Sequence, residues 1–350
     1  MAYMRLFSCY LFFLCALHAQ AQITGGQHVF QFLRLSPSAR ITALGGSQIA
    51  VQDDDPGFAA LNPAALNPSM AGQITLQHNL YLSDIQHGYA AYAWHMPKIG
   101  FTAHGGIQYM DYGSIPMADE FGTVVGEVKA SETAFLVGAA RPLSDRITLG
   151  MNLRFAVSAL DSYKSNALAA DIGGMYADTA RRFTVGLVWR NLGVQTNAYN
   201  DKREDLLSDL QLGFSKRLKH LPFRFSVIAH RLNDWDLRYD DPNAQDSDVI
   251  LFGGEADNND GNPAIDNFFR HFIFNGEFLF GRNDGFRLRF GYNHLRKQEL
   301  SVSGYRSLAG FSGGLGIRTK KLRIDAGYGA YHLAGGVFHM GLGTNLKEIF

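Results

Sequence analysis

Hydrophobic and polar side chains alternate along much of this chain with a period of two residues. From Ile147 to Val157 every second residue is apolar, whereas small or polar residues such as Asn152 and Arg154 occupy the positions between. A period of two places the apolar set on one face of an extended strand, but a helix would scatter it around its circumference. The segment is therefore predicted to be a β-strand with one apolar and one polar face.

Fourteen segments of this kind follow one another after residue 70. They span 71–82, 85–96, 99–111, 131–141, 146–160, 165–177, 182–192, 207–219, 222–233, 268–281, 284–297, 305–318, 321–333 and 336–347. An even number suits a bacterial barrel whose two ends lie on the same side of the membrane. The predicted fold is all-β: a 14-stranded antiparallel transmembrane β-barrel over residues 71–350, preceded by a plug-like segment.

The connections between these segments support the same fold. Every second connection is a short turn, such as Pro97-Lys98 or Arg282-Asn283, and the intervening ones include the long stretches 112–130, 193–206 and 234–267. Outer-membrane barrels have short periplasmic turns and longer external loops. A soluble β-sandwich has no reason to segregate its connections by length.

Four arginines fix which face of these strands points inward. At the mid-plane of a bilayer, an arginine on the lipid face costs about 2 to 4 kcal/mol. The lumen is therefore predicted to be polar, and the side chains predicted to face it are those of Arg154, Arg224, Arg287 and Arg289.

The first 21 residues have the features of a secretory signal peptide. Arg5 precedes an apolar run from Leu6 to Leu17, and the small-residue pattern Ala19-Gln20-Ala21 predicts cleavage after Ala21. The run is too short for a membrane-spanning helix, which needs about 20 residues. Both cysteines lie in this segment, so the mature chain is expected to have no disulfide and no cysteine chemistry.

Composition and residue spacing argue against a nucleic-acid partner and against a metal or cofactor site. Lys plus Arg equals Asp plus Glu at 32 each, so no charge excess favours a nucleic-acid partner. No short metal-ligand spacing such as His-Glu-x-x-His occurs, and neither a metal nor a cofactor is expected. No nucleophile with an oriented base is evident, so the chain is expected not to be an enzyme.

Residues 22–70 form a turn-rich segment before the barrel. Its apolar residues, including Phe30, Phe32 and Phe58, are interrupted by glycine, proline and aspartate clusters. Because these apolar side chains need burial, a compact plug or inner lining of the lumen is favoured over a disordered periplasmic arm. The run Asp53-Asp54-Asp55 before Pro56 favours a turn over a cation site, because the spacing of a calcium loop is missing.

This leader also carries a family resemblance. Ala39-Arg40, Gly45-Gly46, Asp55 and Asn62-Pro63, with their neighbours, resemble the leader of FadL-like barrels. The opening from Gly25 to Leu33 resembles that of the PorQ family, an outer-membrane component of the type IX secretion system.

The resemblance implies a non-enzymatic, monomeric barrel in the outer membrane that belongs to a surface-attachment complex. Its expected partners are a PorZ-like surface protein together with PorU and PorV-like components. That complex removes the signal domain of exported cargo and links the cargo to lipopolysaccharide. The alternative is a FadL-like transporter of hydrophobic molecules, against which the inward arginines argue.

The long acidic stretch 234–266 is the sequence's best candidate for docking an external partner. Aromatic and aliphatic residues lie among its carboxylates, as suits an interface. The predicted contact residues are Trp235, Tyr239, Ile250, Leu251 and Phe252.

Overall fold

The structure is a computed structural model, and it describes residues 28–81, 85–200, 202–238, 263–300, 307–332 and 335–348. The expected signal peptide, 1–21, lies outside the described residues. So does most of the acidic stretch, including Tyr239, Ile250, Leu251 and Phe252.

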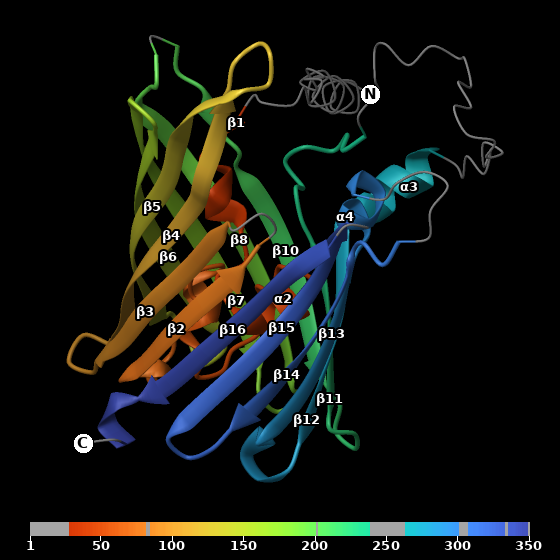
Figure 1. The fold of residues 1–350 in the computed structure, drawn as a ribbon. Helices are drawn as coiled ribbons and strands as arrows, with labels where there is room; N and C mark the ends of the chain where they lie inside the picture. The colour runs from red at the N-terminus through yellow and green to blue at the C-terminus, as the bar shows by residue number, and fades with distance from the viewer. Residues whose placement is uncertain are drawn as a thin grey trace, which may run out of the picture.

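Fourteen antiparallel strands close into a barrel (Figure 1). The last strand pairs with the first, and β7 pairs with β8, so the ring of strands is closed. The strands are β2 Gln73–Leu80, β3 Gln86–Met96, β4 Phe101–Ala118, β5 Val124–Pro142, β6 Ile147–Leu160, β7 Tyr163–Asp178, β8 Phe183–Asn197, β10 Asp209–Arg217, β11 Phe223–Ala229, β12 Phe272–Phe280, β13 Phe286–Asn293, β14 Phe311–Arg318, β15 Leu322–His332 and β16 Gly335–Asn345.

The predicted number of strands, their order and their antiparallel pairing are confirmed, and the differences lie at one end of the barrel. We call this the loop end, and the opposite end, where the short connections lie, the turn end. At the loop end β4 and β5 extend to Ala118 and from Val124, so much of the expected loop 112–130 is a hairpin. Residues 294–297, predicted as strand, begin helix α4 (His294–Glu299), because the Asn293 side chain accepts a hydrogen bond from the Arg296 amide at 3.0 Å. Helix α3 (Pro263–Arg270) precedes β12.

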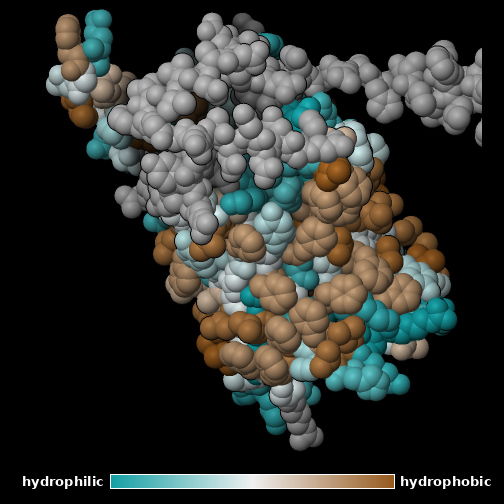
Figure 2. Space-filling view, turned by 90° about the vertical axis from the view of Figure 1, so that its right-hand side faces the viewer, coloured by the Kyte–Doolittle hydropathy of each residue, from teal (hydrophilic) through white to brown (hydrophobic). Residues whose placement is uncertain are grey.

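The outward face of the wall is apolar. In β6 the residues from Ile147 to Phe155 alternate between exposed apolar side chains and buried or half-buried small and polar ones, as the sequence pattern predicts. Figure 2 shows one side of the barrel, where hydrophobic side chains cover a broad area and hydrophilic ones gather at its margin. Such an apolar band suits contact with lipid.

Residues 28–70 fill the lumen, and we call them the plug. The plug comprises a two-residue strand, a helix and four 3₁₀ turns: β1 His28–Val29, η1 Gln31–Arg34, α2 Ala39–Ala43, η2 Pro56–Phe58, η3 Pro63–Ala65 and η4 Pro68–Met70. Ile41, Ile49 and Phe58 form an apolar cluster with Met175 and Ile228 of the wall. A second cluster, nearer the loop end, joins Phe30 and Phe32 of the plug to alanines of β5, β6 and β7. The molecule therefore has its apolar core inside the barrel.

Glycines on the inner face let the plug backbone approach the strands closely. A β-carbon built on Gly327 would lie 2.2 Å from the Ala39 carbonyl oxygen, and one on Gly291 would lie 2.3 Å from the Gly45 nitrogen. Both distances are far below van der Waals contact, so only glycine fits. Glycine commonly marks sites where two backbone segments meet.

Adjacent glycines of β7 give a test of this contact. Gly173 faces the plug, where a β-carbon would lie 2.1 Å from Asn62 Oδ1, whereas on Gly174 it would meet Leu149 at an ordinary 3.4 Å. Overpacking costs about 1–3 kcal/mol. We expect Gly173→Ala to lower the free energy of unfolding by that amount and Gly174→Ala to leave it nearly unchanged, measured by denaturant titration of the refolded protein. Equal effects of the two substitutions would contradict a tight contact between plug and wall.

Candidate functional site: the filled lumen and its two ends

Arg40 of α2 stands at the centre of a buried charge network that joins the plug to the wall. Its Nη1 lies 2.7 Å from Asp53 Oδ2 and 3.5 Å from Asp55 Oδ2, both in the plug. Its Nε and Nη2 donate to the two carboxylate oxygens of Glu277 in β12, at 3.0 and 2.9 Å. The guanidinium also packs over the Phe58 ring, 4.6 Å from its centroid. Arg40 is thus held by three carboxylates from two parts of the fold.

The network continues along the inner wall through alternating charges. Arg289 bridges Glu277 at 2.8 Å and Asp325 at 2.6 Å, and Arg323 pairs with Asp325 at 3.2 Å and with Asp55 of the plug at 2.8 Å. Arg224 adds a contact of 3.1 Å to Glu277. A buried ion pair stabilises a structure only where each charge has good partners, and here the charges are shared among several.

Asp53 shows the electrostatic balance of this network. Burial opposes ionisation of its carboxyl, but the guanidinium groups of Arg40, Arg287 and Arg224 outweigh that cost and hold the pKa of Asp53 well below its ordinary value. The plug therefore carries a carboxylate that stays ionised at neutral pH and that lies 3.9 Å from one arginine of the wall, Arg224.

A second contact region holds the backbone of the plug. Asn152 of β6 donates to the Ala59 carbonyl at 2.9 Å, and Arg154 donates to the Ala60 carbonyl and to Asp171 of β7. Gln108 of β4 donates to the Phe32 carbonyl at 2.8 Å. Polar side chains of the inner face thus satisfy carbonyls that the irregular plug leaves without strand partners.

The wall has a notch at the loop end, and the plug covers it. Pairing between β8 and β10 stops at Arg190 and Asp209, while β8 continues to Asn197. Beyond that point β8 pairs with the short strand β9 (Asp205–Leu206), which in turn pairs with β1. Phe30 and Leu33 pack against Leu206 there. The described residues therefore close the wall where two neighbouring strands separate.

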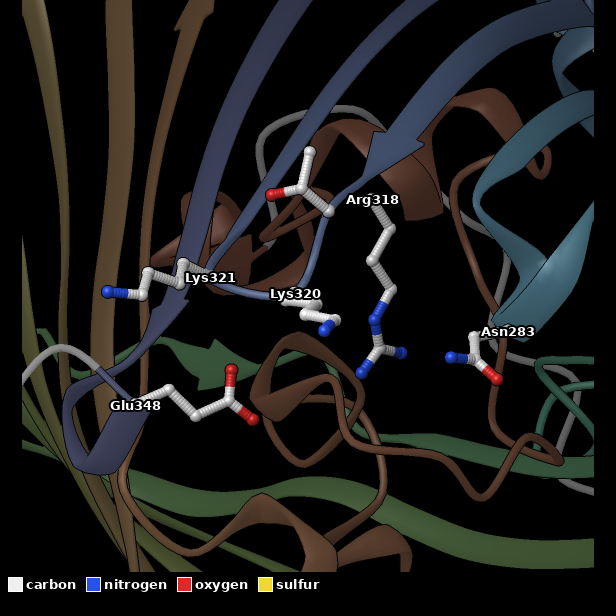
Figure 3. Close-up of a pocket in the computed structure, with 6 residues that line it drawn as sticks. Asn283, Arg318, Lys320, Lys321 and Glu348 are labelled. Atoms are coloured by element: carbon white, nitrogen blue, oxygen red, sulfur yellow. The ribbon is translucent and has the colours of Figure 1, made fainter.

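The turn end carries a shallow, basic pocket of about 650 Å³. It is lined by Asn283, by the turn from Arg318 to Lys321 and by Glu348 (Figure 3). Arg318 is engaged by the plug, because its Nη1 donates to Asp54 Oδ1 at 2.9 Å and its Nη2 contacts the other carboxylate oxygen. The ion pair between Asp54 and Arg318 thus joins the plug to the turn between β14 and β15.

The structure places the predicted leader residues at the turns of the plug. Gly45 and Gly46 follow α2 with φ values of +88° and +94°, which favour glycine. Asn62 begins η3, accepting from the Ala64 amide at 3.0 Å while its amide donates to the Ile49 carbonyl at 2.9 Å. Pro63 is the first residue of that turn. Asp55 begins η2 by accepting from the Gly57 amide at 3.0 Å.

Two further predicted groups have clear positions. The Ala39 amide donates to Gln77 of β2 at 3.0 Å, so α2 is fixed at its start. Of the four arginines predicted to face the lumen, Arg154, Arg287 and Arg289 are buried, and Arg224 is half-buried beside Glu277.

Of the predicted docking residues, the structure describes Trp235 alone. Its side chain is 55% exposed and stacks on His271, with ring centroids 4.7 Å apart. Beside it α3 exposes Ile265, Phe268 and Phe269. These three residues and Trp235 form an apolar surface at the loop end, which we call the rim patch.

Sequence reasoning missed the acidic partners of the inward arginines. Glu277, Asp325 and Asp171 all lie on predicted strands at positions of inward parity, and that parity was the available signal. Within the described ranges, no group of three or more His, Cys, Asp or Glu side chains has the arrangement of a metal site. No described helix is long and apolar enough to cross a membrane.

No protein-family model matches the chain, and no curated protein matches its sequence. Solved structures do resemble it. The CymD monoaromatic hydrocarbon channel aligns with a TM-score of 0.52 and 10% identity, covering 90% of this chain and 97% of CymD. A deletion mutant of the TodX monoaromatic hydrocarbon channel aligns with a TM-score of 0.52 and 10% identity, covering 89% of this chain and 97% of TodX. A FadL homologue from Pseudomonas aeruginosa aligns with a TM-score of 0.48 and 11% identity, covering 88% of this chain and 98% of the homologue.

The matches to CymD and TodX show that the chain has the fold of FadL-like outer-membrane barrels. The expected likeness to these barrels is therefore confirmed at the level of fold. At 10% identity the likeness extends to the fold alone.

Removal of the central arginine tests whether the charge network holds the plug. Losing one partner of a buried pair costs about 3–5 kcal/mol, whereas an exposed pair contributes about 0–1 kcal/mol. We expect Arg40→Met to lower the free energy of unfolding by the larger amount and to expose the plug to trypsin. The control is Arg217→Met, which removes a partly exposed two-bond pair with Asp284 at 2.8 and 2.9 Å. Similar losses in the two variants would refute a central role for Arg40.

Proposed function

We propose that this chain is a non-conducting, non-enzymatic outer-membrane barrel that carries a surface partner, as the PorQ-like component of a type IX attachment complex. The observation that carries the proposal is the filled lumen. The plug is fixed to the wall by two apolar clusters and by the network around Arg40. A barrel packed in this way has its working surfaces at its ends.

The rim patch supplies the surface for a partner. Trp235, Phe268 and Phe269 project from the loop end, where α3 and α4 stand beside the mouth of the barrel (Figure 1). Exposed aromatics are the residues that most often anchor protein interfaces. The expected partner is a PorZ-like surface protein, with PorU and PorV-like components in the same complex and lipopolysaccharide as the acceptor of cargo.

The second candidate is a channel for small hydrophobic molecules. The comparisons favour it, because CymD and TodX are described as hydrocarbon channels and share this fold. Against it, the interior of the barrel holds the charged side chains of Arg40 from the plug and of Glu277 and Arg289 from the wall, whereas hydrophobic ligands are bound in mostly apolar cavities. The two candidates therefore differ in whether anything passes through the barrel.

A flux measurement separates these candidates. We expect proteoliposomes containing the full chain to take up toluene no faster than protein-free liposomes, and planar bilayers with the protein to show no steady conductance. An open porin serves as the positive control. Protein-dependent toluene uptake would replace the anchor proposal with the transporter.

The rim patch is tested by partner retention. We expect the double variant Trp235→Ser, Phe268→Ser to reach the outer membrane and to recover a PorZ-like protein at less than about a tenth of the wild-type yield, since an aromatic at the hot spot of an interface contributes about 2 kcal/mol. The measurement is quantitative mass spectrometry after pull-down from solubilised envelope. The control is Phe121→Ser, at the tip of the β4–β5 hairpin and 87% exposed. Undiminished recovery with the double variant would exclude the rim patch as the docking surface.

A further inference from the structure

A polar cavity of about 180 Å³ lies at the loop end, between the plug and the wall. It is separate from the rim patch, and it combines residues of the plug, of four strands and of α4. Its basic side chains come from three different elements: Arg34 is the last residue of η1 in the plug, Arg190 lies on β8, and Arg296 lies on α4. Three arginines from separate parts of the chain thus line one cavity.

Arg190 is the most deeply placed of the three. Its side chain is 3% exposed, and its Nη2 donates to the Leu33 carbonyl at 3.3 Å. Its Nε has no hydrogen-bond partner among the described residues. A buried charged donor without a partner costs free energy, so this arrangement is expected only where something else compensates it.

Arg296 and His230 also have buried nitrogens without a hydrogen-bond partner among the described residues. Arg296 is positioned by stacking on the Tyr331 ring, 4.0 Å from its centroid, and its buried Nη1 also lacks a partner in the described chain. His230 is 5% exposed, and its Nε2 atom also has no hydrogen-bond partner among the described residues. Three side chains that line this cavity therefore each have a buried nitrogen without a hydrogen-bond partner among the described residues.

Two carboxylates also line the cavity, but they do not satisfy these donors. Asp209 accepts from the Gln211 side chain at 2.6 Å and from the Arg231 amide at 2.7 Å. Glu299 is exposed and lies on the last turn of α4. Three guanidinium groups against two carboxylates leave the cavity with a positive charge.

We propose that this cavity binds a phosphate-type oxyanion. Guanidinium groups donate paired hydrogen bonds that match the geometry of phosphate, and the ligand would supply acceptors for Arg190 and Arg296. The phosphate comes either from a phosphorylated lipid of the outer leaflet or from a free phosphate in the medium. Because Arg34 belongs to the plug and Arg296 to α4, bound phosphate ties the plug to the loop end. This inference is independent of the anchor function.

The pocket at the turn end is a weaker candidate for the same chemistry. Its Arg318 already has Asp54 as a partner, and its lysines are exposed. That difference makes Lys321, at the opposite end of the molecule, a suitable control position.

The experiment follows the thermal unfolding midpoint of the detergent-solubilised full chain in phosphate-free buffer. Sodium phosphate is added at constant ionic strength, and a ligand that binds the folded state raises the midpoint with saturation. We expect this rise in the wild type and in Lys321→Gln. We expect Arg296→Gln and Arg34→Gln to weaken the apparent affinity about tenfold or more, as the loss of a charge-assisted hydrogen bond implies.

Two further arms identify the source. Phosphatidylcholine vesicles containing lipid A are compared with vesicles containing dephosphorylated lipid A. Stabilisation by lipid A alone assigns the site to a lipid headgroup, and stabilisation by inorganic phosphate assigns it to free phosphate. No saturable rise in any arm, or a rise that both arginine variants retain, overturns the proposal. An equal rise with octanoate, lost in the same variants, overturns the choice of phosphate in favour of a carboxylate.

Discussion

The polar inner face of the barrel has to find partners away from bulk water, and the rest of the structure depends on how it does so. Fourteen strands with lipid-compatible outward faces necessarily point their polar residues at one another across a narrow lumen. In this protein the plug supplies the missing partners through Arg40, Asp53 and Asp55. Because these three charges have partners on both the plug and the wall, neither part is satisfied without the other.

The same constraint explains the shape of the interior. Irregular backbone inside a barrel is tolerated only where its carbonyls and amides are satisfied, and Asn152 and Gln108 each satisfy one plug carbonyl. Inward glycines such as Gly327 let the plug reach the wall, while alanines and methionines pack against its apolar residues. The lumen is therefore a core with charges at its centre, and the surfaces open to other molecules lie at the two ends.

Sequence reasoning was most successful where a local rule acts. Strand positions followed from the period of two, because lipid on one side and a polar lumen on the other impose it on each residue separately. It was wrong about 294–297, where the Asn293 side chain begins a helix, and about 112–130, where β4 and β5 continue as a hairpin. At the loop end the bilayer no longer imposes the pattern, and local hydrogen bonds decide the structure.

By itself, the sequence determined the barrel, its number of strands and the turns of the leader, since periodicity and residues such as Gly45 and Asn62 act over a few positions. Only the tertiary structure decided which charges meet. Arg40 and Glu277 are 237 residues apart, and Arg190, Arg296 and Arg34 come from three separate elements. The alternation along a strand shows that a side chain points inward. Which other inward side chain lies opposite depends on the register of every strand between the two, and the closure of the barrel sets that register.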